Sequence, residues 1–422
     1  MFKLDTLNNG ITLLTAPLKE TQAVTVLVLV KVGSRYEPLK LNGISHFIEH
    51  LLFKGTGKRP TSLDITKELD GVGADYNAFT AKDHTGYYVK VEKEHLKLAL
   101  DIVADMLFNP LFPKAEMEKE RGVIIEEINM YEDNPLMLIG DIFESCIFSG
   151  HALGQRISGP KQNIKNLKQE TIVDFYQKHY LNRRLLVGIG GNFPAQDIKK
   201  IVNQYFGAKR LAGQKRPFSK FVLKQRQPKA NLHYKDTSQA QLALGLPAFK
   251  NTDPRFYPLT LLAVILGGNM SSRLFLEIRE KRGLAYFVRA GVNLYEDTGA
   301  FLVQAGLEKS RIFEAVKVIR EELEKAREKG VTAEELKRAK EFIKGKLVLQ
   351  LEDSASLISW LGEQRLLADK VESAETKLKK INAVTLEDVK KVAQQIFDFK
   401  KINLGLIGPF KEKSRFLNIF KN

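Results

Sequence analysis

The sequence predicts an α+β protein built from two homologous domains, and three observations support this fold class. A chain of 422 residues is too long for a single hydrophobic core. A pattern of one helix and one strand at 171–193, opened by Thr171, recurs 214 residues later at 385–410, opened by Thr385. Residues 74–91 and 286–307 each read as two β-rich segments around a polar turn. We therefore expect each domain to be a mostly antiparallel sheet packed with helices.

A basic stretch containing glycine and proline separates the two halves. Residues 209–235 hold nine Lys and Arg and no Asp or Glu, a large part of the formal net charge of +16. We interpret this stretch as a solvated linker. The predicted boundaries are 1–212 for the first domain, 213–230 for the linker and 231–422 for the second domain.

The elements of the first domain follow from local patterns. Residues 1–18 predict a hairpin that turns at Asn9-Gly10, and the β-branched run 23–32 predicts a buried strand. Gly43 is expected to open the next helix. Further helices are expected from Ser62, as the capping residue, to about Leu69, and from about 94 to 107.

The helix after Gly43 carries the run His46-Phe47-Ile48-Glu49-His50. His46 and His50 are four residues apart, so their imidazoles lie on one face of a helix and can bind one metal ion. Glu49 lies beside that face, where a general base for a metal-bound water is needed. The alternative is a pair of histidines packed in the core. The run supplies only two ligands, so a metal site requires a third from elsewhere.

A helix between Pro113 and Pro135 offers that third ligand. At about 100° per residue, Glu120 and Glu127 lie along the inner edge of its apolar face, whereas Glu126 points to solvent. Either inner carboxylate can ligate the metal while the other supports it. The alternative is an ordinary half-buried acidic stripe.

This pattern resembles the inverzincin zinc peptidases, the family of pitrilysin, insulin-degrading enzyme and the mitochondrial processing peptidase. In that family the third zinc ligand is a glutamate some seventy-odd residues after the second histidine, with a supporting glutamate seven residues before it. Glu127 lies 77 residues after His50 and seven after Glu120. The resemblance therefore implies one Zn²⁺ per chain, bound by His46, His50 and Glu127 and supported by Glu120.

The resemblance also implies how a substrate is bound. Asn77, Ala78, Phe79 and Thr80 match the family's substrate-binding edge strand. Arg279 and Tyr286 match its R-x6-Y element, which helps to bind the peptide and to stabilise the transition state. Without the resemblance neither Arg279 nor Tyr286 would be singled out, and Arg282 is close enough in sequence to be confused with Arg279.

The second domain is expected to bind no metal, because the segment equivalent to the metal helix, 256–268, contains no ligand residues. The resemblance extends along the whole chain and is closest to the bacterial processing-peptidase-like members of about this length. Since longer members carry four such domains in two halves of a clamshell, this chain corresponds to one half. A homodimer is expected, with a heterodimer with a second family member as the alternative.

The predicted function is that of a zinc-dependent endopeptidase that cleaves short or unfolded peptides, bound as an extended strand in an enclosed chamber. Glu49 is the predicted general base. A non-catalytic or partner-dependent subunit of a processing peptidase is one alternative.

A basic nucleic-acid-binding protein is another, but no helix-turn-helix, zinc-finger or RNP pattern accompanies the charge. The chain lacks an apolar run of the ~20 residues that a membrane span needs. Its start does not follow the signal-peptide pattern. We therefore expect a cytoplasmic protein that binds neither nucleic acid nor membrane.

Overall fold

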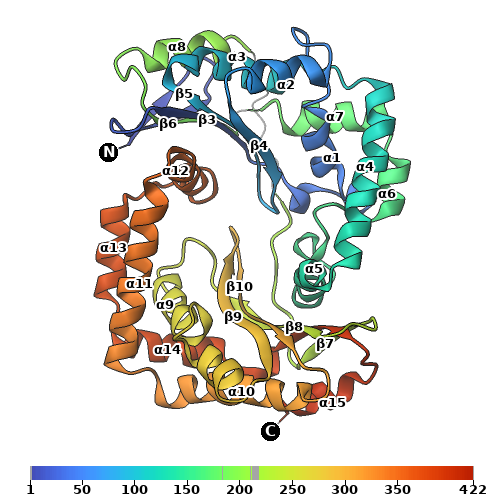
Figure 1. The fold of residues 1–422 in the computed structure, drawn as a ribbon, viewed down its shortest axis with the longest axis vertical. Helices are drawn as coiled ribbons and strands as arrows, with labels where there is room; N and C mark the ends of the chain where they lie inside the picture. Colours follow the sequence, from blue (N-terminus) through green and yellow to red (C-terminus); the bar gives the residue numbers. More distant parts are fainter. Residues whose placement is uncertain (1, 183, 210, 212–217, 422) are drawn as a thin grey trace. The chain divides into compact units, whose positions relative to one another are not determined.

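The computed structural model describes residues 2–182, 184–209, 211 and 218–421. Contacts divide the described chain into two compact units. The first unit is drawn from residues 1–128, 155–219 and 347–373, and the second from residues 129–154, 220–346 and 374–422. The α+β class is confirmed, since each unit contains one sheet and several helices (Figure 1).

The sheet of the first unit has six described strands in the order β1-β2-β6-β3-β5-β4. All neighbours are antiparallel except β2 and β6. The predicted hairpin is formed by β1 and β2, with Gly10 at a φ of 90° in its turn. The strands are β1 (Lys3–Thr6), β2 (Thr12–Pro17), β3 (Ala23–Val30), β4 (Asp75–Thr80), β5 (Thr85–Glu92) and β6 (Leu185–Gly191).

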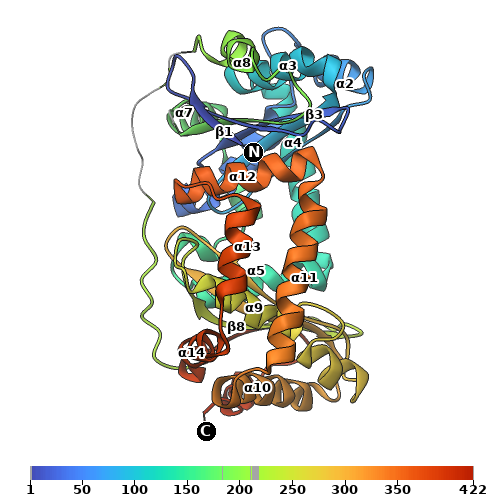
Figure 2. The ribbon, with the colours of Figure 1, turned by 90° about the vertical axis from the view of Figure 1, so that its left-hand side faces the viewer.

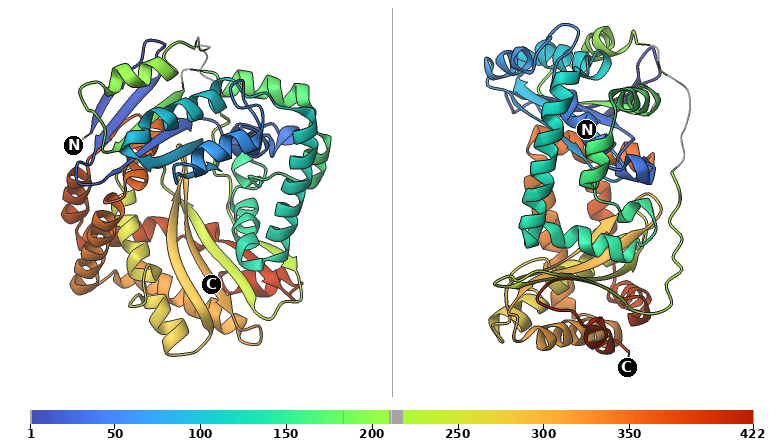
Figure 3. Two further views of the ribbon diagram at one scale, coloured as in Figure 1. Left: turned by 45° about the horizontal axis from the view of Figure 1, so that its top comes forward. Right: turned by 90° about the vertical axis from the view of Figure 1, so that its right-hand side faces the viewer.

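The sheet of the second unit repeats this topology in the order β7-β11-β8-β10-β9. The strands β7, β11, β8, β10 and β9 correspond in this order to β2, β6, β3, β5 and β4 of the first sheet. The one parallel pair, β7 with β11, corresponds to the parallel pair β2 with β6. The long strands β9 and β10 run side by side (Figure 3). The predicted duplication is therefore visible in the sheets. The strands are β7 (Lys229–Tyr234), β8 (Ala240–Ala248), β9 (Ala285–Leu294), β10 (Gly299–Leu307) and β11 (Asn403–Gly408).

The helices of the two units also correspond. In the first unit α1 packs against the edge strand β4, and in the second α9 packs against β9, so 256–268 is the counterpart of the motif helix. The helices of the first unit are α1 (Ile44–Leu51), α2 (Ser62–Asp70), α3 (Leu96–Phe108), α6 (Lys161–Asn166), α7 (Gln169–His179), α8 (Ile198–Phe206) and α12 (Ser354–Ala368). Those of the second are α5 (Pro135–Ile147), α9 (Phe256–Gly267), α10 (Ile312–Lys329), α13 (Ala374–Ala383), α14 (Leu386–Ile396) and α15 (Lys413–Asn418).

The units differ from the predicted contiguous domains in two segments. The long helices α4 (Lys114–Asp133) and α11 (Ala333–Leu351) each begin in one unit and end in the other. The helix after α4, α5, packs on β8 and β11 of the second unit, and the helix after α11, α12, packs on β3 and β6 of the first (Figures 1 and 2). The two domains therefore exchange equivalent helices, which a boundary drawn at one point of the sequence does not capture.

The unit boundary after Ser219 falls inside the predicted linker 213–230. Residues 213–217 of that linker lie outside the described residues, and 218–228 form no helix or strand. No described helix is long and apolar enough to cross a membrane.

Two predicted capping residues are wrong. Thr61, one residue before Ser62, caps α2 and forms a capping box with Asp64. Helix α7 begins at Gln169, two residues before Thr171, because Gln169 and Glu170 are good helix formers and extend it. Thr385, by contrast, caps α14 as predicted.

Candidate metal centre

Helix α1 is short and nearly surrounded by core side chains. Its N-cap is Gly43, whose φ of 102° favours glycine. Ile44, Phe47, Ile48 and Leu51 are fully buried in the core of the first unit. His46 is 8% exposed, so the imidazoles of α1 stand at the margin of an apolar environment.

The structure brings His46, His50 and Glu127 together. One ligand atom of each lies within 4.8 Å of the others. Glu127 Oε2 lies 3.4 Å from His46 Nε2 and 3.6 Å from His50 Nε2. Tetrahedral zinc with ligands at about 2.0–2.1 Å holds neighbouring ligand atoms about 3.3–3.4 Å apart. The three side chains therefore fit one zinc ion with little movement.

Two of these side chains have a buried polar atom without a hydrogen bond. Glu127 Oε2 and His46 Nδ1 find no partner among the described residues. Glu126, the neighbour of Glu127, is exposed. A buried carboxylate oxygen without a partner is costly, and a cation bound between it and the histidines would satisfy it.

Glu120 lies on α4 two helical turns before Glu127 and contacts the cluster from there. Its Oε2 accepts a hydrogen bond from His50 Nδ1 at 3.0 Å, and its Oε1 pairs with Lys54 Nζ at 2.8 Å. With the proton on Nδ1, the Nε2 lone pair of His50 is free for a metal, which is the usual carboxylate–histidine–zinc arrangement. Sequence reasoning placed Glu120 here but missed Lys54, because nothing in its local pattern distinguishes it from other surface lysines.

The electrostatics of the site suit metal binding. Burial, with a smaller contribution from His50, lowers the pKa of His46 to about 3, so this imidazole is neutral and able to ligate at neutral pH. Burial raises the pKa of Glu127, an effect that His50 opposes. The pKa of Glu120 is lowered, because the hydrogen bonds and charges of His50 and Lys54 outweigh the effect of burial.

Glu49 joins the motif helix to the edge of the sheet. Its Oε2 accepts a hydrogen bond from Thr80 Oγ1 at 2.5 Å. Burial raises the pKa of Glu49 and Glu127 adds to this, while Thr80 and His50 oppose it. A carboxylate whose pKa is raised toward neutrality is a suitable general base.

The predicted substrate strand lies at an edge of its sheet. Asn77, Ala78, Phe79 and Thr80 belong to β4, which pairs with β5 on one side only among the described strands. Side chains along β4 alternate between the two faces of the sheet. One face, with Tyr76, Ala78 and Thr80, is turned to α1 and Glu49, and the other carries Asp75, Asn77 and Phe79. The free edge of β4 can pair with another extended strand.

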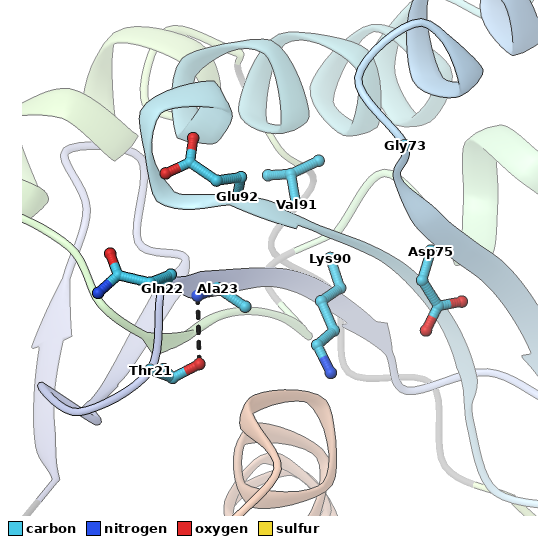
Figure 4. Close-up of a pocket in the computed structure, with 8 residues that line it drawn as sticks. All are labelled: Thr21, Gln22, Ala23, Gly73, Asp75, Lys90, Val91 and Glu92. Carbon is cyan, nitrogen blue, oxygen red and sulfur yellow. Dashed lines mark hydrogen bonds between the residues drawn. The ribbon is translucent and has the colours of Figure 1, made fainter.

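A pocket of about 390 Å³ lies at the Asp75 end of β4, opposite the end that carries Thr80, and does not include the metal cluster (Figure 4). In it, Ala23 N donates to Thr21 Oγ1, and Lys90, paired with Asp353, stands opposite Asp75 in the strand register.

Arg279 and Tyr286 lie together in the second unit. The Arg279 guanidinium is 5.6 Å from the Tyr286 ring centroid and 4.9 Å from that of Phe275. Tyr286, on the edge strand β9, is 72% exposed. Arg282, with which Arg279 can be confused in sequence, is instead paired with Glu277.

Comparisons with known proteins identify similar chains and folds. Residues 13–161 match the model of insulinase (peptidase family M16), and residues 166–343 match that of the peptidase M16 inactive domain. A protein of Streptomyces coelicolor described as an uncharacterized zinc protease is 38% identical over 416 residues, which cover 97% of this chain and 90% of the relative. A Bacillus subtilis protein with the same description is 34% identical over 409 residues, covering 97% and 98%.

Among solved structures, a protease from Helicobacter pylori has the same fold. Its TM-score is 0.90 at 24% sequence identity, and the match covers 97% of this chain and 99% of the other.

Proposed function

The chain belongs to the insulinase peptidase family, M16, and from this premise we propose that it is a zinc-dependent endopeptidase. The observation that carries the proposal is the cluster of His46, His50 and Glu127 with Glu49 on the same helix turn. A zinc ion held by these three side chains would activate a water molecule and polarise a peptide carbonyl.

The residues of the chain then have distinct roles. The Glu49 carboxylate takes a proton from the attacking water and later delivers it to the amine of the cleaved peptide. Thr80 orients Glu49 through its hydroxyl, and β4 binds the substrate as an added antiparallel strand. Because such pairing needs a free backbone, extended or unfolded peptides are the proposed substrates.

The test compares Glu49→Gln with the wild type and with Glu126→Gln, a change of an exposed neighbour of the site. A mixed peptide library is digested with and without chelator, and products are read by mass spectrometry. Glu49→Gln should keep its zinc and lose activity by roughly 100- to 10,000-fold, the usual contribution of a general base. Normal cleavage by Glu49→Gln, or wild-type cleavage that resists chelation, would contradict the proposal.

We also propose that two copies of the chain form the active species, with Arg279 and Tyr286 of one copy completing the zinc site of the other. The support is that the Tyr286 side chain is exposed and that the Arg279 side chain is 36% exposed, with only a long ion pair of 4.0 Å to Glu280 among the described residues. His46→Ala and Arg279→Ala chains are mixed after each has been shown to be weak alone. Partial recovery supports completion in trans; no recovery despite proven subunit exchange contradicts it.

A partner-dependent, non-catalytic subunit is the second candidate. The match of residues 166–343 to the inactive domain of the family favours it. It predicts zinc binding without cleavage of any peptide by the chain alone, and the same library digestion separates the two functions.

A further inference from the structure

The first turn of α1 is capped from outside the helix. The N-cap residue Gly43 has no side chain, and α1 has no side-chain cap of its own. A Cβ at Gly43 would lie 2.7 Å from both Ile164 Cδ1 and Ser158 O, and the φ of 102° disfavours any other residue. The Ser, Thr, Asp or Asn that usually satisfies the first N–H groups is therefore excluded from this position.

Glu37 supplies the missing acceptors. Its Oε2 accepts from Gly43 N at 2.8 Å and from Asn42 Nδ2 at 2.9 Å, and its Oε1 accepts from Ser45 N at 2.8 Å. Glu37 is 3% exposed. Burial raises the pKa of Glu37, and the three contacts, which all come from donors, oppose this effect by favouring the carboxylate anion, as does the positive end of the helix dipole.

Ser45, the residue before the first histidine of the candidate metal site, is held through the peptide groups on both of its sides. Ser45 N donates to Glu37, while Ser45 O accepts from Tyr180 Oη at 3.3 Å. Ser45 and Tyr180 are both fully buried. Since His46 follows directly, the position of its imidazole depends on these two contacts.

The segment that carries Glu37 is itself fixed to the turn after β4. Ser34 N donates to Ala81 O and Arg35 N to Lys82 O, and Arg35 Nη1 pairs with Asp83 Oδ1 at 2.8 Å. Both members of the Arg35–Asp83 pair are buried.

Two sets of contacts therefore join helix α1 to strand β4. One runs from the turn after β4 through Arg35 and Glu37 to the start of α1, and the other joins Glu49 to Thr80 on β4. We propose that Glu37 is a positioning residue that holds α1 in register with β4 and so sets His46 and His50 in the geometry that the metal requires. This inference rests on the proposed zinc function and adds to it a residue that touches neither metal nor substrate.

The test measures metal binding, which a general loss of stability does not change at temperatures where the protein is folded. Glu37→Gln places an amide among three donors and should weaken zinc affinity about tenfold, the low end of effects for residues that orient ligands. The matched control is Asp105→Asn, a carboxylate of similar burial in the same unit that accepts from Thr56, Lys58, Arg59 and Asn109 and from none of the residues of α1. Zinc affinity is measured by competition with a chromogenic chelator, and the visible spectrum of the cobalt-substituted proteins reports the ligand geometry.

The expected result is a weaker affinity and an altered cobalt spectrum for Glu37→Gln only. Equal zinc affinities and identical spectra for Glu37→Gln and Asp105→Asn overturn the inference. If Glu37→Gln does not fold, Glu37→Asp decides, because it keeps the charge but shortens the side chain that reaches Gly43 N and Ser45 N; a zinc affinity equal to that of the wild type then overturns the inference. A wild-type chain that binds no zinc refutes the proposed function instead.

Discussion

Replacing Glu127 by glutamine tests the most specific feature of the site. Glu127 Oε2 has no hydrogen-bond partner among the described residues and faces both histidines at 3.4 and 3.6 Å. Glu127→Gln therefore removes a charged ligand without breaking a hydrogen bond of that oxygen. Residues that only orient ligands change metal affinity by about 10- to 100-fold, so a direct ligand should exceed the upper figure, roughly 2.7 kcal/mol or more.

The assay uses metal-free protein and a competing chromogenic chelator, and the melting temperature of the metal-free form is measured in parallel. Glu127→Gln should lose at least roughly 100-fold in zinc affinity while the metal-free protein melts nearly as the wild type does. Glu126→Gln, a change of the exposed neighbour, should behave as the wild type in both measurements. A normal affinity for Glu127→Gln, or a large loss for Glu126→Gln, would refute the assignment of the third ligand.

Three further predictions concern the support of His50, the pairing of the substrate with β4 and an ion pair of the second unit. Glu120→Gln should weaken zinc affinity by about 10- to 100-fold in the same competition assay, because the single amide oxygen cannot accept from both His50 and Lys54 and carries no charge to fix the His50 tautomer. A peptide with proline in the segment that pairs with 77–80 should resist cleavage, since proline lacks a ladder donor; equal cleavage rates for both peptides would contradict strand pairing. In the second unit, burial raises the pKa of Glu335, but the contacts with Arg273 and Thr332 outweigh it and lower this pKa to about 2. The ion pair of Glu335 with Arg273 should contribute about 2 kcal/mol to stability above pH 4.5, and this contribution should be lost as the pH falls toward 2. In a plot of melting temperature against pH, Glu335→Gln should therefore lose less stability between pH 4.5 and 2 than the wild type does. The control Glu334→Gln, a change of an exposed side chain, should leave this pH dependence unchanged.

The sequence was most informative where geometry is local. Two histidines four residues apart on a helix necessarily share a face, and the helical period alone separates Glu127 from Glu126. The strand with Thr80 and the duplicated strand pairs were likewise predictable from β-rich segments and turn residues, whereas the edge position of that strand was implied only by the family resemblance. The contact between Thr80 and Glu49 was not, because it depends on how α1 packs on β4.

Features that depend on packing between distant segments were not predictable. An amphipathic helix such as α5 or α12 shows which face is buried but not which sheet covers it, so the exchange of these helices leaves no local signal. Glu37 was missed for a similar reason, since it accepts from a helix N-cap, Gly43, that lies six residues later in the chain. Sequence patterns for capping consider only residues at the helix end itself.

The duplicated topology allows the polar groups of the candidate metal site to be compared with their counterparts in the second unit. Helix α9, which packs on β9 as α1 packs on β4, is apolar apart from Tyr257 and Thr260 and carries no metal-ligating side chain. Helix α1 has instead two imidazoles and a carboxylate at the margin of the core, together with a second buried carboxylate, Glu37, at its start. Buried polar groups destabilise a fold unless each finds a partner. In the first unit Thr80, Glu120 and the donors around Glu37 supply part of these partners, while Glu127 Oε2, beside the two histidines, is among the buried side-chain atoms that have no hydrogen-bond partner in the described residues. A cation bound between His46, His50 and Glu127 would satisfy that oxygen, a requirement that the counterpart helix α9 does not have.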